Sequence, residues 1–178
     1  MPTPPSLSIR IKRHSDGSAS LTLTRADGGV TWQRQKGQLG NVFSPHDLTH
    51  YAVETSLGYD KAFYGLVADG WEIADFASPW PRGEIPREAR EVELIVGFFD
   101  SERRNSEHWT TKEFNAHAVT FVSASKYAET LPPPVLTDDQ IARVRTLRDE
   151  LLARWFATRP GNAIELVFEK SASLRSTT

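Results

Sequence analysis

Apolar and polar residues alternate along three short segments in the N-terminal part of the chain, at 7–12, 21–24 and 30–34. A period of two is typical of a β-strand that buries one of its faces. The segments are separated by residues 15–18 and 26–29, and both connections contain Asp-Gly, a pair that favours tight turns. The pattern therefore predicts a three-stranded antiparallel meander.

Later in the chain, apolar residues recur at intervals of three or four, which is typical of amphipathic helices. A Thr-x-x-Gln capping box precedes the last of these segments, and a glycine is placed to end the first. The predicted helices cover residues 45–57, 60–68, 86–103, a segment that begins at 110 or 111, and 138–158.

A final apolar segment, 164–168, predicts a strand that joins the N-terminal sheet. The expected fold class is α+β, with a small antiparallel sheet (the N-terminal three-strand meander plus the C-terminal strand) packed against four or five helices. A chain of 178 residues is long enough for one substantial core. We expect a single domain over residues 7–170, with a disordered lead at 1–6 and a disordered tail at 171–178.

The composition is that of an ordinary soluble protein, with 39% hydrophobic and 25% charged residues. A net charge of −2 gives no general attraction to nucleic acid or to anionic membranes, so neither is expected as a partner. Because there is no cysteine, disulfides, thiolate nucleophiles and Cys-based metal sites are excluded. No signal peptide or membrane-length apolar stretch is recognised, which predicts a cytoplasmic location. The aromatic content leaves a homodimer as an option.

The segment SPHDLTHYAVE concentrates more ionisable chemistry than any other part of the chain. Ser44, Pro45 and Asp47 have the order of an N-cap, a first helical residue and a capping-box carboxylate. A helix that begins there places His46 and His50 four residues apart on the same face. Asp47 is interpreted as structural, and the two imidazoles are the candidates for chemistry.

Two imidazoles at this spacing can place their ring nitrogens on one divalent metal ion. Imidazole ligands favour zinc, although manganese, iron and nickel accept them as well. Glu54 lies roughly 12 Å from His46 along the helix axis, which is too far for both to bind one ion easily. Glu54 is therefore expected to act as the catalytic group that handles protons, or to orient His50 by accepting its second N–H.

A metal held by the two histidines needs a further ligand from another segment. His117 is the candidate, because it lies beside Phe114 on its predicted helix and follows Glu113 by one turn. The alternative interpretation is a histidine of the core whose ring is hydrogen-bonded to the backbone.

These residues favour a divalent-metal-binding enzyme, similar to metal-dependent hydrolases, that acts on a small substrate through a metal-activated water. His46, His50 and His117 are its expected metal ligands, and zinc is its expected ion. The alternative is a non-catalytic protein-binding or regulatory module, in which the histidine-rich helix is only capped and ion-paired and exposed apolar residues meet a partner. No motif in the chain identifies a known family.

Overall fold

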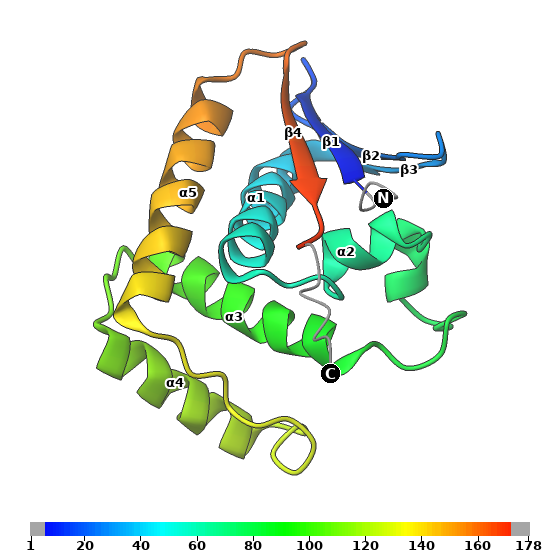
Figure 1. Ribbon diagram of the computed structural model, residues 1–178. Coiled ribbons are helices and arrows are strands. Elements are labelled where there is room, and N and C mark those ends of the chain that lie inside the picture. The colour runs from blue at the N-terminus through cyan, green and yellow to red at the C-terminus, as the bar shows by residue number, and fades with distance from the viewer. Residues whose placement is uncertain (1–5, 172–178) are drawn as a thin grey trace.

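The computed structural model describes residues 6–171, and its sheet has four antiparallel strands in the order β3-β2-β1-β4 (Figure 1). Because β1 pairs with both β2 and β4, the first and last strands of the chain lie side by side. The predicted meander and its extension by the C-terminal strand are confirmed. The strands are β1 (Ser6–Arg13), β2 (Ala19–Arg25), β3 (Val30–Gln35) and β4 (Ala163–Glu169).

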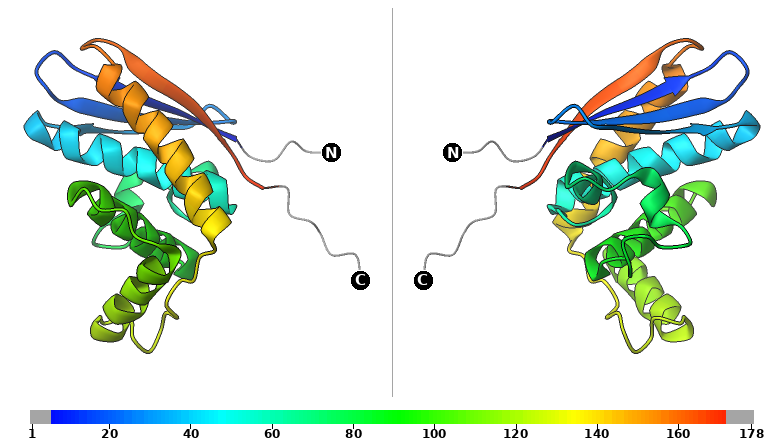
Figure 2. Two further views of the ribbon diagram at one scale, coloured as in Figure 1. Left: turned by 90° about the vertical axis from the view of Figure 1, so that its left-hand side faces the viewer. Right: turned by 90° about the vertical axis from the view of Figure 1, so that its right-hand side faces the viewer.

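All the helices lie on one face of the sheet (Figure 2). In β1 and β2 the side chains on this face are mostly apolar and buried, whereas the alternate positions carry polar residues such as Arg10 and Thr22. Period-two alternation therefore assigned the faces of these two strands correctly. In β3 it did not, because Val30 and Trp32 are exposed and the polar Thr31 and Gln35 are buried. The buried residues of β1 and β2 include Leu7, Ile9, Ile11, Leu21 and Leu23.

The helices form layers of increasing distance from the sheet, with α1 against the sheet, α3 beneath α1, and α4 farthest away (Figures 1 and 2). Helix α5 runs alongside α1, and two short 3₁₀ turns, η1 and η2, complete the described elements. The bounds are η1 (Gly37–Leu39), α1 (Gly40–Leu57), α2 (Phe63–Ala68), η2 (Ile73–Phe76), α3 (Arg87–Arg104), α4 (Thr111–Ala124) and α5 (Asp138–Ala157).

The expected α+β class is confirmed, since a four-stranded antiparallel sheet packs against the helices. The predicted disordered lead and tail fall outside the described residues except at their inner ends. Ser6 already belongs to β1, and the backbone N–H of Ser171 donates a hydrogen bond of 2.8 Å to Asp60 Oδ1. None of the described helices combines the length and the apolar character that a membrane crossing requires.

The predicted start of α1, with Ser44 as N-cap and Pro45 as the first helical residue, is wrong. The helix begins at Gly40, directly after η1, and its N-cap residue Leu39 makes no capping hydrogen bond through its side chain. Pro45 therefore lies inside the helix, near its N-terminus. Because proline has no N–H, the carbonyl of Asn41 has no helical donor, and it can bond to water since Asn41 is exposed.

The earlier start brings the helix N-terminus close to the sheet. A Cβ on Gly40 would lie 2.8 Å from the backbone nitrogen of Ala19 in β2, so only glycine permits this approach. Asp47 is then too deep in the helix to cap it, and its carboxylate accepts a hydrogen bond from Gln35 Nε2 in β3 at 3.1 Å instead.

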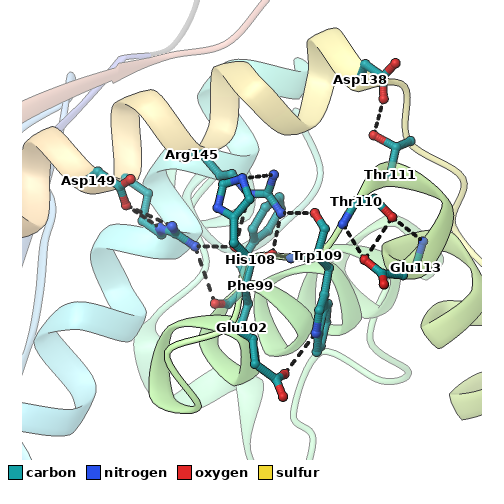
Figure 3. Close-up of polar contacts among 12 residues, drawn as sticks. Phe99, Glu102, His108, Trp109, Thr110, Thr111, Glu113, Asp138, Arg145 and Asp149 are labelled. Atoms are coloured by element: carbon teal, nitrogen blue, oxygen red, sulfur yellow. Dashed lines mark hydrogen bonds and ion pairs between the residues drawn. The ribbon is translucent and has the colours of Figure 1, made fainter.

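The other helix ends agree with the sequence patterns, except that α2 begins at Phe63 and not at residue 60. Gly58 ends α1 with φ of 73°, in the left-handed region that favours glycine. Thr137 and Gln140 form the predicted capping box of α5, and Thr110 forms one with Glu113 at the start of α4 (Figure 3). Because Glu113 bonds to Thr110, its carboxylate serves the helix terminus.

A buried carboxylate joins α3 to α5. Glu102, which is 1% exposed, accepts both donors of the Arg145 guanidinium fork and also the backbone N–H of Trp109 at 3.2 Å (Figure 3). Arg148 Nη1 lies 3.5 Å from the same carboxylate. A bidentate pair of this kind holds the two helices in a fixed relative position.

Removing this carboxylate is expected to destabilise the fold strongly. Glu102→Ala leaves two arginines without their buried counter-charge, so urea unfolding should show a loss of about 3–5 kcal/mol. Glu165→Ala removes the exposed partner of Arg10 and should cost about 1 kcal/mol or less. Equal losses in the two variants would contradict the structural role of Glu102.

Candidate metal centre

A cleft of about 830 Å³ opens between α1, α3 and the segment that contains η2. Its walls are largely apolar, but one part of the surface is formed by the histidine-rich stretch of α1 and the facing side of α3. The ionisable residues of this part are His46, Asp47, His50, Arg90 and Glu93.

His46 and His50 face the same side of α1, as their spacing predicted. Their ring centroids lie 4.7 Å apart and the ring planes meet at 80°. His50 is buried, with 6% of its surface exposed, and His46 is partly exposed. The two rings therefore converge at the wall of the cleft instead of pointing into open solvent.

Glu93 of α3 faces both rings across the helix interface. Its Oε2 atom lies 2.9 Å from His50 Nε2, and its Oε1 atom lies 3.7 Å from His46 Nε2. One ligand atom from each of these three residues falls within 4.8 Å of the others, a spacing that a single metal ion can bridge. His46, His50 and Glu93 are the set that the structure brings together among the described residues.

The other nitrogen of each ring bonds to a second carboxylate. His46 Nδ1 lies 2.7 Å from Asp100 Oδ2, and His50 Nδ1 lies 3.3 Å from Glu54 Oε1. Because carboxylates accept hydrogen bonds, both Nδ1 atoms are assigned a proton, and both Nε2 atoms are directed at Glu93. This is the arrangement by which proteins fix the tautomer and orientation of metal-binding histidines.

The two supporting carboxylates are themselves held in place. Asp100 Oδ1 accepts a hydrogen bond from Thr49 Oγ1 at 3.2 Å, and Glu54 Oε2 accepts one from the backbone N–H of Tyr64 at 2.9 Å. Glu54 is 1% exposed and lies behind the ring of His50, away from the cleft surface. Its position is that of the orienting acceptor, the second of the two roles expected for it.

His117 is not brought to this centre. Its ring stacks on Trp109 with a centroid distance of 4.4 Å, on the exposed side of α4, and it also meets the edge of Phe98. The position that the sequence analysis gave to His117, as the third ligand from another segment, is occupied by Glu93.

Glu93 and Asp100 were missed because neither belongs to a recognisable motif. The sequence does contain a weak signal, since they are seven residues apart and so share a face of α3. Asp100 also follows Phe99, at the edge of the apolar stripe of the helix, where a carboxylate needs a partner.

The centre carries more acidic than basic groups. Four carboxylates lie at or near the two imidazoles, and the guanidinium of Arg103 has its Nε atom 3.9 Å from Asp100 Oδ1. A divalent cation would offset this excess of negative charge. The four acids are Asp47, Glu54, Glu93 and Asp100.

The protonation of the centre follows from burial and these contacts. Burial lowers the pKa of His50, but the hydrogen bonds to Glu54 and Glu93 outweigh it and raise the pKa to about 10 in the ion-free protein. Burial raises the pKa of Glu54, and the hydrogen bond from His50 opposes this effect. A proton therefore occupies the position between His50 and Glu93 that a metal ion would take.

Asp47 lies on the cleft wall, and in the sequence it stands between His46 and His50. Burial raises the pKa of its carboxyl to about 6, and the hydrogen bond from Gln35 offsets part of this rise. The group therefore changes its charge close to neutral pH, which is a property of proton-transferring residues in clefts.

Comparison with protein-family models, with curated proteins and with solved structures gives no match for this chain. The geometry of the centre is therefore the basis on which a function can be assigned.

The raised pKa of Asp47 predicts a pH-dependent effect of Asp47→Asn. Between pH 4 and 6 the native state binds more protons than the unfolded state, so wild-type stability falls as the pH rises through this range. In the presence of a chelator, Asp47→Asn should thus be the more stable protein at pH 7.5, by up to about 3 kcal/mol. At pH 4, urea unfolding should no longer show the higher stability of Asp47→Asn. The same difference in stability from the wild type at pH 4 and at pH 7.5 would contradict the prediction.

Proposed function

We propose that the protein binds a divalent metal ion through His46 Nε2, His50 Nε2 and the Glu93 carboxylate. The observation that carries the proposal is the arrangement of the two rings. Each Nδ1 bonds to its own anchored carboxylate, and each Nε2 is directed at a third carboxylate on the cleft wall. A simple ion pair between the helices needs only one contact between an imidazole and a carboxylate. A metal site needs both Nδ1 atoms held by acceptors and both Nε2 atoms directed at a third ligand.

Two histidines and one glutamate form a ligand set used by catalytic zinc sites, which keep a fourth position for water. The same set with open positions also suits iron(II), and manganese accepts similar ligands. We propose zinc, because the chemistry expected of the centre needs no change of oxidation state. The open position of the ion would face the cleft, where a small substrate can reach it.

The reaction proposed is hydrolysis. Zinc held by these residues would supply hydroxide at neutral pH, since it lowers the pKa of a bound water to near 7, for attack on a carbonyl or phosphoryl centre. Asp47, on the cleft wall, would accept the proton of the water and return it to the leaving group. Glu54 acts through His50 as a positioning residue, since it has no surface in the cleft.

A second candidate is a non-catalytic binding module. It is favoured by the short contact of 2.9 Å between His50 and Glu93, which can join α1 to α3 as an ion pair without any metal. Val119 and Phe121 on α4, each 49% exposed, would then contact a protein partner. A cytoplasmic location and a homodimer stay predictions from the sequence.

Metal binding separates the two candidates. Protein produced without a histidine tag, stripped with chelator and reloaded with zinc, should retain about one equivalent by elemental analysis. His50→Ala and Glu93→Gln should lose it, and Glu54→Gln should bind zinc about 10–100-fold more weakly, because the ring of His50 is no longer oriented.

Glu91→Gln is the matched control, since Glu91 lies on α3 but its carboxylate accepts a hydrogen bond from Tyr59 outside the centre. It should keep the wild-type zinc content. If zinc content is the same in the wild type and in His50→Ala, the metal site is refuted and the binding module is favoured.

Hydrolysis is tested with the zinc-loaded protein on a panel of p-nitrophenyl carboxylate and phosphate esters. Turnover is expected to rise with pH to a plateau near neutrality as the bound water ionises, and to fall to background in His50→Ala and Glu93→Gln. Restoring zinc after chelation should restore the rate in the wild type alone. A zinc-loaded protein that hydrolyses none of these esters, while its zinc content is normal, would argue against hydrolysis and leave the metal site standing.

A further inference from the structure

The cleft beside the proposed metal centre has an aromatic wall. The ring of Phe63, the first residue of α2, lies 5.8 Å from the ring of His50 and 4.9 Å from that of Phe76 in η2. Trp80, Ile85 and other apolar residues continue this surface. A flat apolar group bound here would lie near the ring of His50, a proposed metal ligand.

Arg90, a positively charged residue of α3, lines the same cleft. Arg90 lies three residues before Glu93, so the two side chains are neighbours on one helix face. Its Nε atom is buried and has no hydrogen-bond partner among residues 6–171. Its ion pair, with Glu84 at 3.2 Å, uses Nη1 and involves a carboxylate that is 82% exposed.

The guanidinium thus lines the cleft with an exposed ion pair, and a ligand carboxylate could replace Glu84 as its partner. A guanidinium that offers two parallel N–H groups matches a carboxylate in shape and charge. An unpaired, buried Nε–H is costly unless a ligand or water accepts from it. Lys126, which follows α4, adds a second positive charge at the cleft and has its Nζ atom 5.1 Å from the ring centre of Tyr127.

The proposed metal centre itself is acidic, so the positive charges of Arg90 and Lys126 affect which substrates can approach it. Asp47, Glu54, Glu93 and Asp100 would repel an anionic substrate that had no cation of its own. Arg90 supplies this cation about one helical turn from Glu93, and it lines the same cleft as the aromatic wall.

We infer that the substrate is a small amphiphilic carboxylate, with an aromatic body against Phe63 and Phe76 and its carboxylate on Arg90. This inference rests on the proposed function in one respect, the position of the bond that reacts. That bond would lie at the metal, between the aromatic contact and the contact with Arg90. Arg90 is a specificity-determining residue in this arrangement. A neutral compound with the same body loses the guanidinium contact and binds more weakly.

The test compares three small probes by NMR titration: 3-phenylpropanoate, its neutral amide 3-phenylpropanamide, and propanoate, which lacks the ring. Each is titrated into the full chain, both stripped with chelator and loaded with zinc. We expect 3-phenylpropanoate to bind about tenfold or more tightly than either of the other two, because only it makes both contacts. The preference over the amide should persist without metal, since it depends on Arg90.

Arg90→Gln should abolish the preference for the carboxylate, and Arg90→Lys, which keeps the charge but not the fork, should retain part of it. Phe76→Ala should weaken 3-phenylpropanoate and leave propanoate unchanged. Arg87→Gln is the matched control, an exposed arginine one turn earlier on the same helix, and should behave as the wild type. Thermal melts confirm that each variant is folded.

The inference is overturned if carboxylate and amide bind equally, if no probe binds, or if Arg90→Gln keeps the wild-type preference. A preference that appears only with zinc and survives in Arg90→Gln would also overturn it, because the carboxylate would then bind the ion. These results are independent of the zinc content of His50→Ala, so the substrate class and the metal site can fail separately.

Discussion

The structure depends on the contact between α1 and α3, where imidazoles from one helix meet carboxylates from the other. His46 bonds to Asp100 and His50 to Glu93, and the two contacts lie about two turns apart along α3. Polar groups in a helix interface are tolerated only when each has a partner. These partners fix the register of the two helices, and the same register creates one side of the cleft.

The centre is supported from two further directions. Gly40 lets the start of α1 approach β2, and Gln35 of β3 bonds to Asp47, so the sheet positions the helix that carries the histidines. On the opposite side, Glu102 and the arginines of α5 hold α3. Sheet, α1, α3 and α5 thus form a rigid support, whereas the aromatic wall comes from the shorter elements α2 and η2. The proposed metal centre would thus lie on long helices and the proposed substrate wall on short elements.

Most of the fold followed from local patterns, because period-two segments, capping boxes and Gly58 each reflect interactions within a few residues. The start of α1 could not be found in this way. The Ser-Pro-x-Asp order is a good local signal, but contact of Gly40 with β2 is a tertiary constraint that extends the helix past it. For the centre, the spacing of His46 and His50 was sufficient to bring the rings together. Glu93 could not be chosen over His117, since the choice depends on which face of α3 lies against α1.

Glu54 bonds to the ring of His50 with one oxygen and to the backbone of Tyr64 with the other. The orientation of an imidazole at the centre is therefore linked to the place where α2 begins, and α2 begins with Phe63, the ring nearest to that imidazole. Under the proposed function, the orientation of a ligand ring and the wall that selects the substrate would thus share one structural element. Specificity would then diverge most easily through η2 and the loop with Trp80, where residues can change size while His46, His50 and Glu93 keep their geometry.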